Sequence, residues 1–245
     1  RRNPVTGKTK HLAFMGTGNF NEATARLYCD HGFFTAKSEF TDEIIKLFQY
    51  IENQDNVPKF KHLLIPNINL IETFEACIKQ EMKNAQKGKK GYILLKMNGL
   101  EDPYMMDRLY EASEQGVKID LIVRGICRII PNQKYSKNIR TIRIVDRFLE
   151  HARVFVFHNN GNTKMYMGSA DWMRRNLYRR IECIFPIYNE NLKQEMLDIL
   201  NIQLKDNTKA RVINENLENV KIENKEEPIA AQAAIYNYLA TKIQR

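Results

Sequence analysis

The feature that most limits the fold is a series of apolar strands and a helix in the middle of the chain. Residues 92–97 and 117–123 are strongly apolar, and the second run is rich in β-branched side chains, which is typical of buried strands. Between them, Asp102-Pro103 combines an N-cap acid with a first-turn proline, which marks the start of a helix. A further strand is expected at 139–145. Strands that alternate with helices predict an α/β fold.

The flanking segments extend this pattern on both sides. We expect strands at 11–15, 33–34, 62–66 and 179–186, and helices at 41–52, 192–204 and 228–243. The first helix carries Ile44, Ile45, Phe48 and Ile51 on one face, and Asn69 with Glu72 forms a capping box for another helix. Residues 205–227 are polar and predict an exposed connection with at most a short strand. The breaker-rich loop at 53–58 predicts a domain boundary, which divides 1–62 from 63–245.

A β-hairpin is predicted next, and it carries the first candidate functional residue. His151 opens an alternating apolar run that ends at Phe157, a polar Asn/Gly turn follows, and a second short strand occupies Met165–Met167. This arrangement places His151 and Gly168-Ser169 at the same edge. Small residues there would let backbone N–H groups approach an anion. An isolated histidine at a strand start is, however, more often structural than catalytic.

A repeated motif favours the functional interpretation. Residues 14–19 (Phe-Met-Gly-Thr-Gly-Asn) parallel residues 166–171 (Tyr-Met-Gly-Ser-Ala-Asp). Two such copies suggest a pseudo-twofold site built from equivalent edges. In the second copy the histidine lies 17 positions before the glycine. The same spacing before Gly16 falls ahead of residue 1, so we expect the chain to begin inside the first half-motif, without its histidine.

Four side chains at strand ends or adjoining loops form the candidate site: Tyr28, Arg124, His151 and Arg180. Arginine at a strand end suits bidentate phosphate binding, and an imidazole can protonate a leaving oxygen or attack phosphorus itself. The alternatives are surface ion pairs for the arginines and ordinary packing for Tyr28. Trp172 is interpreted as a core residue rather than a base-stacking one.

Composition narrows the class of partner. Lys and Arg number 38 against 29 Asp and Glu, a formal charge of +9, which implies an anionic partner such as nucleic acid, another polyanion or acidic lipid. Four scattered cysteines without a CxxC pair argue against a zinc site or a disulfide framework, and favour reduced thiols in a cytoplasmic protein. The longest apolar stretches are interrupted by arginines, so no segment is expected to span a bilayer.

These motifs resemble the C-terminal part of bacterial polyphosphate kinases of the first type, which are phospholipase-D-like enzymes. The resemblance runs over nearly the whole chain, and the segments that carry it are Gly16–Glu22, Thr24–Tyr28, Leu121–Cys127, Ile144–His151 and Ser169–Met173. It implies a phospholipase-D-like mixed sheet flanked by helices. It also implies two tandem catalytic domains, of which residues 1–62 would be the last part of the first and 63–245 the whole second one.

The same resemblance implies an activity and roles for residues. The reaction would be reversible transfer of the terminal phosphate of ATP to inorganic polyphosphate through a phosphohistidine, with Mg²⁺. Tyr28, Arg124 and His151 would contact the phosphates, with His151 as a second, acid/base histidine, and Arg180 and Asn19 would be further contacts. The family's phosphorylated histidine lies in a His-Ala-Lys motif that this sequence lacks. We therefore expect the chain to be inactive alone, with the magnesium ligands outside it.

The expected partners are ATP or ADP and inorganic polyphosphate, with homo-oligomers of the longer protein and no nucleic acid. The expected location is cytoplasmic, with peripheral attachment to the inner membrane as an alternative. A phospholipase-D-like nuclease or lipase would need His-x-Lys, where this chain has His151-x-Arg153. A non-catalytic polyanion- or nucleic-acid-binding module is the other alternative. Its binding would be insensitive to His151 and steeply dependent on salt.

Overall fold

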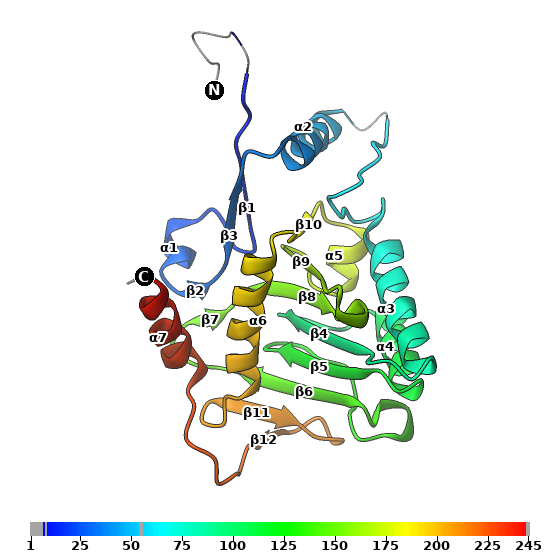
Figure 1. Cartoon of the computed structure of the whole chain (residues 1–245), viewed down its shortest axis with the longest axis vertical. Coiled ribbons are helices and arrows are strands. Elements are labelled where there is room, and N and C mark those ends of the chain that lie inside the picture. Colours follow the sequence, from blue (N-terminus) through cyan, green and yellow to red (C-terminus); the bar gives the residue numbers. More distant parts are fainter. Residues whose placement is uncertain (1–6, 8, 54–55, 244–245) are drawn as a thin grey trace.

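An eight-stranded mixed sheet forms the centre of the molecule (Figure 1), seen in a computed structural model that describes residues 7, 9–53 and 56–243. The strand order is β10-β9-β8-β4-β5-β6-β11-β12. Strands β4, β5 and β6 run parallel, and the other neighbouring pairs are antiparallel. The α/β mixed sheet flanked by helices that the sequence predicted is confirmed. Its strands are β4 (Tyr92–Met97), β5 (Lys118–Val123), β6 (Ile139–Ile144), β8 (Arg153–Phe157), β9 (Lys164–Gly168), β10 (Ile184–Pro186), β11 (Ala210–Ile213) and β12 (Asn219–Lys221).

Helices cover both faces of this sheet, which explains why its central strands are apolar throughout rather than alternating (Figure 1). Helices α3 (Leu70–Gln86) and α4 (Pro103–Glu114) pack on one face, and α6 (Glu190–Leu204) packs on the other. The two-residue period of a strand divides β8 between them: Phe155 and Phe157 point to the first cluster, and Val154 and Val156 to the second. Asp102 caps α4 by accepting a hydrogen bond from Met105 N, as predicted.

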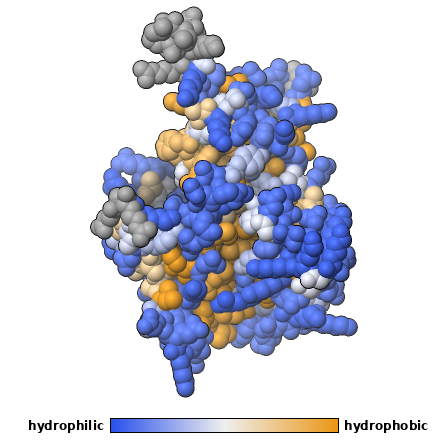
Figure 2. All heavy atoms as spheres, in the orientation of Figure 1, coloured by the Kyte–Doolittle hydropathy of each residue, from blue (hydrophilic) through white to orange (hydrophobic). Residues whose placement is uncertain are grey.

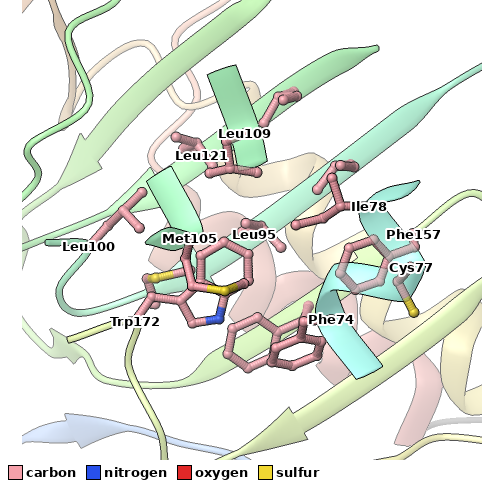
Figure 3. Packing of buried hydrophobic residues seen from close by; sticks show 14 of the residues in the cluster. Phe74, Cys77, Ile78, Leu95, Leu100, Met105, Leu109, Leu121, Phe157 and Trp172 are labelled. Atoms are coloured by element: carbon pink, nitrogen blue, oxygen red, sulfur yellow. The ribbon is translucent and has the colours of Figure 1, made fainter. Parts of the chain in front are cut away.

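The first face has an aromatic centre, part of which Figure 3 shows. Phe74 of α3 lies with its ring centroid 5.7 Å from that of Trp172 and 4.8 Å from that of Phe155. Trp172 has no exposed surface. Its interpretation as a core residue is therefore confirmed.

The N-terminal segment has its own small strand pair. Its elements are β1 (Ala13–Gly16), α1 (Glu22–Ala25), β2 (Tyr28–Cys29), β3 (Gly32–Thr35) and α2 (Ser38–Glu52). Strands β1 and β3 are antiparallel partners. Strand β2 instead pairs in parallel with β7 (Leu149–Glu150), which directly precedes His151. This pairing brings two segments about 120 residues apart in sequence to the same place.

Two predicted features are wrong for local reasons. Residues 62–66 form no strand; Leu64 makes only an isolated bridge to Ile184. The side chain of Asn69 does not cap α3, because its Oδ1 accepts a hydrogen bond from Ile65 N and its Nδ2 donates to Leu63 O. Asn69 therefore stabilises the preceding turn, and the capping box with Glu72 is not formed.

Other boundaries differ because tertiary contacts decide them. Helix α2 buries Phe40, Glu43 and Leu47, whereas Phe48 of the predicted apolar face is 63% exposed. The strand expected at 179–186 is reduced to β10, and an unpredicted short helix, α5 (Arg174–Tyr178), precedes it. The polar connection at 205–227 contributes β11 and β12, which extend the sheet from the edge of β6.

The last helix, α7 (Ala231–Ile243), lies beside α6 (Figure 1). Within the described residues, no helix is both long and apolar enough to cross a membrane.

Candidate functional site

A polar cavity of about 390 Å³ lies where the loops after β1, β4, β5 and β9 meet. We call it the site cavity. Four of the five predicted site residues line it: Asn19, Arg124, His151 and Arg180. These residues lie far apart in the sequence, and the fold brings them to the same cavity. Its other lining residues include Thr17, Asn98, Arg153, Ser169, Asp171, Arg175, Asn176 and Glu182.

The two copies of the repeated motif face this cavity together. Thr17 and Asn19 follow β1, and their counterparts Ser169 and Asp171 follow β9; all four line the cavity. The structure thus places the equivalent strand ends around one space, which is the arrangement that the repeat suggested.

The backbone nest expected at these glycines is not formed. Thr17 N donates to His31 O at 3.0 Å, and Ser169 N donates to Cys183 O at 3.2 Å. Both N–H groups are therefore used by neighbouring segments. Gly168 is small for a packing reason, since a Cβ there would lie 2.3 Å from Cys183 O. These two N–H groups are therefore not available to an anion.

His151 is buried and held by a carboxylate from the N-terminal segment. Its Nδ1 lies 3.0 Å from Asp30 Oδ1 and 3.1 Å from Oδ2, and Asp30 Oδ1 also accepts a hydrogen bond from Thr17 Oγ1 at 2.8 Å. A carboxylate accepts only, so this contact favours the tautomer with its proton on Nδ1 and leaves Nε2 as the basic nitrogen. Such an imidazole is arranged for proton transfer.

Arg153 lies against this imidazole and is fixed by Asp171. Its Nη1 lies 3.1 Å from His151 Nε2 and 3.2 Å from Nδ1 and donates to Thr17 O at 3.0 Å, while its Nη2 donates to Asp171 Oδ2 at 3.0 Å. Both charged side chains are at most 10% exposed. Asp171 also accepts hydrogen bonds from the backbone N–H groups of Asn98 and Gly99. Arg153 is thus an internal partner, and Asp171, which lines the cavity, joins the loops after β4 and β9 to Arg153.

The two predicted arginines differ in how firmly they are held. Arg124 follows β5, is half-buried, and donates from Nε to Asn98 Oδ1. Burial lowers the pKa of Arg124 from its ordinary value, an effect that the nearby Asp171 opposes. Arg180 is exposed and reaches the cavity from the turn after α5. Of the predicted pair, one guanidinium is fixed by a hydrogen bond and the other is exposed, and both are suited to phosphate.

Tyr28 occupies a different position from the other predicted residues. Its ring packs on the His151 imidazole, with centroids 4.5 Å apart, and it lines a neighbouring cavity of about 290 Å³ with Phe14 and Phe20. Asn19 lines both cavities. Tyr28 therefore supports the imidazole from behind rather than facing the site cavity.

Asp30, Thr17 and Asn98 were not proposed from the sequence as site residues. Asp30 is paired with a histidine 121 residues away, and Asn98 with Asp171, 73 residues away. Two sequence signals could have identified two of these residues: Asp30 lies just after the Tyr28 segment, and Thr17 lies inside the repeated motif. No local sequence pattern around Asn98 indicates a role in the site.

The described residues around the site cavity do not fit a magnesium ion. No group of three or more His, Cys, Asp or Glu among the described residues is arranged to hold a metal. Asp30 and Asp171, the carboxylates nearest His151 and Arg153, already accept hydrogen bonds from these neighbours and others, whereas Mg²⁺ needs at least one carboxylate free to complete a near-octahedral set of oxygens. The expectation that magnesium ligands lie outside this chain stays a prediction.

The fold and the cavity together define a mixed α/β protein with a basic, histidine-containing site suited to anions. Two family profiles match the chain: "Polyphosphate kinase C-terminal domain 1" over residues 2–57 and "Polyphosphate kinase C-terminal domain 2" over residues 63–232. The chain belongs to the polyphosphate kinase family. The sequence resemblance is thereby confirmed, whereas the exact division at residue 62 stays a prediction.

Individual relatives agree with the profiles. The polyphosphate kinase of Escherichia coli strain K12 is 44% identical over 235 residues, which is 95% of this chain and 34% of that protein. The polyphosphate kinase of Vibrio cholerae is 45% identical over 93% of this chain and 33% of its own length. The crystal structure of the Porphyromonas gingivalis polyphosphate kinase superposes with a TM-score of 0.92 at 46% identity, over 98% of this chain and 37% of that chain. The chain spans about a third of the length of these relatives.

Proposed function

We propose that the chain is the phosphate-binding part of a polyphosphate kinase and that the site cavity holds phosphate groups of ATP, ADP or polyphosphate. The observation that carries the proposal is the convergence of Arg124, Arg180 and His151 on one cavity from three separate segments. The similarity to polyphosphate kinases supports the choice of substrate. The reaction would be the reversible transfer of the terminal phosphate of ATP to polyphosphate through a phosphohistidine.

In this proposal His151 moves a proton and is not itself the phosphorylated group. Its Nε2 would donate a proton to, or accept one from, an oxygen atom bonded to the reacting phosphorus. Asp30 would accept the hydrogen bond from Nδ1 and stabilise the charged imidazolium. Arg124 would hold two non-bridging phosphate oxygens in a fixed orientation, because the Asn98 side chain fixes the Nε of Arg124. Arg180 and Asn19 would close the cavity around the phosphate from its exposed side.

The proposal is tested by the binding of a non-hydrolysable ATP analogue and of long-chain polyphosphate to two matched variants. Arg180 lines the site cavity, whereas the adjacent Arg179 does not, and both are exposed. Arg180→Ala should weaken binding by about 10-fold or more, because a charge-assisted contact is lost. Arg179→Ala removes the same charge and should change affinity much less. Equal effects of both variants, with a steep dependence on salt, would favour a binding module that responds to net charge alone.

A further inference from the structure

The first turn of α7 contacts the residue before β7, the strand that directly precedes His151. Gln232 accepts a hydrogen bond from Phe148 N at 3.0 Å through Oε1 and donates from Nε2 to Phe148 O at 2.8 Å. The side-chain amide therefore satisfies both backbone groups of Phe148, as a neighbouring strand would. Phe148 immediately precedes β7, whose two residues are otherwise paired only with β2.

The same amide also fixes a buried carboxylate. Gln232 Nε2 donates to Glu150 Oε1 at 2.8 Å, while Glu150 Oε2 accepts from Lys96 Nζ and from Gln203 Nε2, each at 2.7 Å. Glu150 is 4% exposed, and Lys96 holds its pKa below the ordinary value in spite of burial. Side chains from β4, α6 and α7 thus hold the residue directly before His151.

Strand β7 connects these side chains to the His151 imidazole through its pairing with β2. His151 N donates to Cys29 O at 3.2 Å, and Leu149 N donates to Leu27 O at 2.8 Å. These bonds align β2, which carries Tyr28 against one side of the His151 ring and leads directly to Asp30 at its Nδ1. A shift of β7 would therefore move the imidazole and its carboxylate partner relative to each other.

Helix α7 is itself anchored at its N-terminus. Asp206, which is 1% exposed, accepts a hydrogen bond from Ala231 N at 2.7 Å through Oδ2. Its Oδ1 accepts from the backbone N–H groups of Thr208, Lys209 and Ala210 at the start of β11. The first turn of α7 is thus tied to the sheet, so the position of Gln232 is determined by a rigid element rather than by a loose end.

We propose that Gln232 is a positioning residue, through which α7 holds His151 in its hydrogen bond with Asp30. The effect of Gln232 on catalysis rests on the proposed function, whereas its effect on the His151–Asp30 hydrogen bond does not. A purely structural role for Gln232 would lower the stability of the whole fold and leave the His151–Asp30 contact intact in the molecules that remain folded.

The test compares Gln232→Leu with Gln194→Leu in the whole chain, labelled with ¹⁵N-histidine. Gln194 is an exposed glutamine of α6 whose Nε2 donates to Asp198 Oδ1, so it serves as the matched control. The readout is the NMR signal of the His151 Nδ1 proton, identified by its absence in His151→Asn. We expect Gln232→Leu to lose this signal while the amide signals of β4 and β5 persist, and Gln194→Leu to retain it.

A Gln232→Leu protein that is folded and keeps the His151 Nδ1 proton signal would overturn the proposal. Should this variant not fold, Gln232→Asn replaces it, because an amide one methylene shorter cannot reach Phe148 and Glu150 together; loss of the signal is expected and its retention would overturn the proposal. The readout needs no nucleotide. A wild-type chain with the signal but without affinity for the ATP analogue would therefore refute the proposed function and not the role of Gln232.

Discussion

At the scale of single residues, two carboxylates organise the site by accepting hydrogen bonds from distant segments. Asp30 joins the N-terminal segment to His151, and Asp171 joins the loops after β4 and β9 to Arg153. Asp171 is 3% exposed, and several hydrogen-bond donors replace its lost hydration, which is what a buried charge requires. The candidate catalytic imidazole is thus positioned by groups that are themselves fixed.

His31, next to Asp30, makes stability depend on pH. Burial, with a further contribution from the positive charge of Lys96, lowers the pKa of His31 from 6.5 to about 4. The unfolded chain then binds more protons than the folded chain between these values, so the free energy of unfolding should fall as the pH falls through this window. Urea unfolding at about pH 7 and about pH 4.5 should show a smaller loss for His31→Gln than for wild type.

The matched control is His11→Gln, which changes an exposed histidine. It should lose as much stability as the wild type between the two pH values. If His31→Gln lost stability as steeply as the wild type, the buried neutral state assigned to His31 would be wrong.

How far the sequence can predict such a site depends on the range of the interactions. Arg124 and His151 were identified because their position at strand ends is a local property. Asp30 was missed because only the β2–β7 pairing brings it to His151, and no local pattern encodes a pairing between segments 121 residues apart. The nest expected at Gly168-Ser169 was wrong because Ser169 N donates to Cys183 O, which is likewise a tertiary contact.

At the scale of elements, α2 is joined to the segment after 53–58 by one carboxylate. Glu43 is 6% exposed and accepts hydrogen bonds from the backbone N–H groups of Lys61 at 2.6 Å, His62 at 3.0 Å and Leu63 at 2.8 Å. Three consecutive donors on one acceptor leave this segment little freedom. The proposed boundary between 1–62 and 63–245 is thus crossed by a fixed connection.

Removal of this acceptor should both destabilise the chain and loosen the connection. Glu43→Ala leaves up to three N–H groups without their acceptor, and we expect a loss of about 2–4 kcal/mol in the free energy of unfolding. The adjacent Asp42 is exposed, so Asp42→Ala serves as the control and should change stability by less than about 0.5 kcal/mol. Urea unfolding and limited proteolysis near residues 56–63 measure the two effects. Equal proteolysis rates in both variants would refute this role of Glu43.

The elements that the sequence predicted best are those whose surroundings are uniform. The runs at 92–97 and 117–123 are buried on both faces, so hydrophobicity alone identifies them as β4 and β5. Prediction failed where one contact decides the outcome. Strand β11 forms because the edge of β6 is available, and β12 then pairs with β11, although residues 219–221 are all exposed.

At the scale of the whole molecule, the two profile-matched segments form one site. The loop after β1 belongs to the first segment and the loop after β9 to the second, and both line the site cavity. The chain has a net charge of +9, and its surface in the view of Figure 2 is largely hydrophilic, with apolar side chains between. Charge alone would attract many anions. The converging side chains of the cavity are the feature that would select phosphate.

The most direct measurement is a crystal structure of the chain with a non-hydrolysable ATP analogue. We predict phosphate oxygens within hydrogen-bond distance of Arg124 and Arg180, with His151 Nε2 facing a phosphate oxygen and Asp30 still bonded to Nδ1. A nucleotide bound elsewhere on the surface, or a site cavity without density at saturating nucleotide, would contradict the assignment of this cavity as the phosphate site.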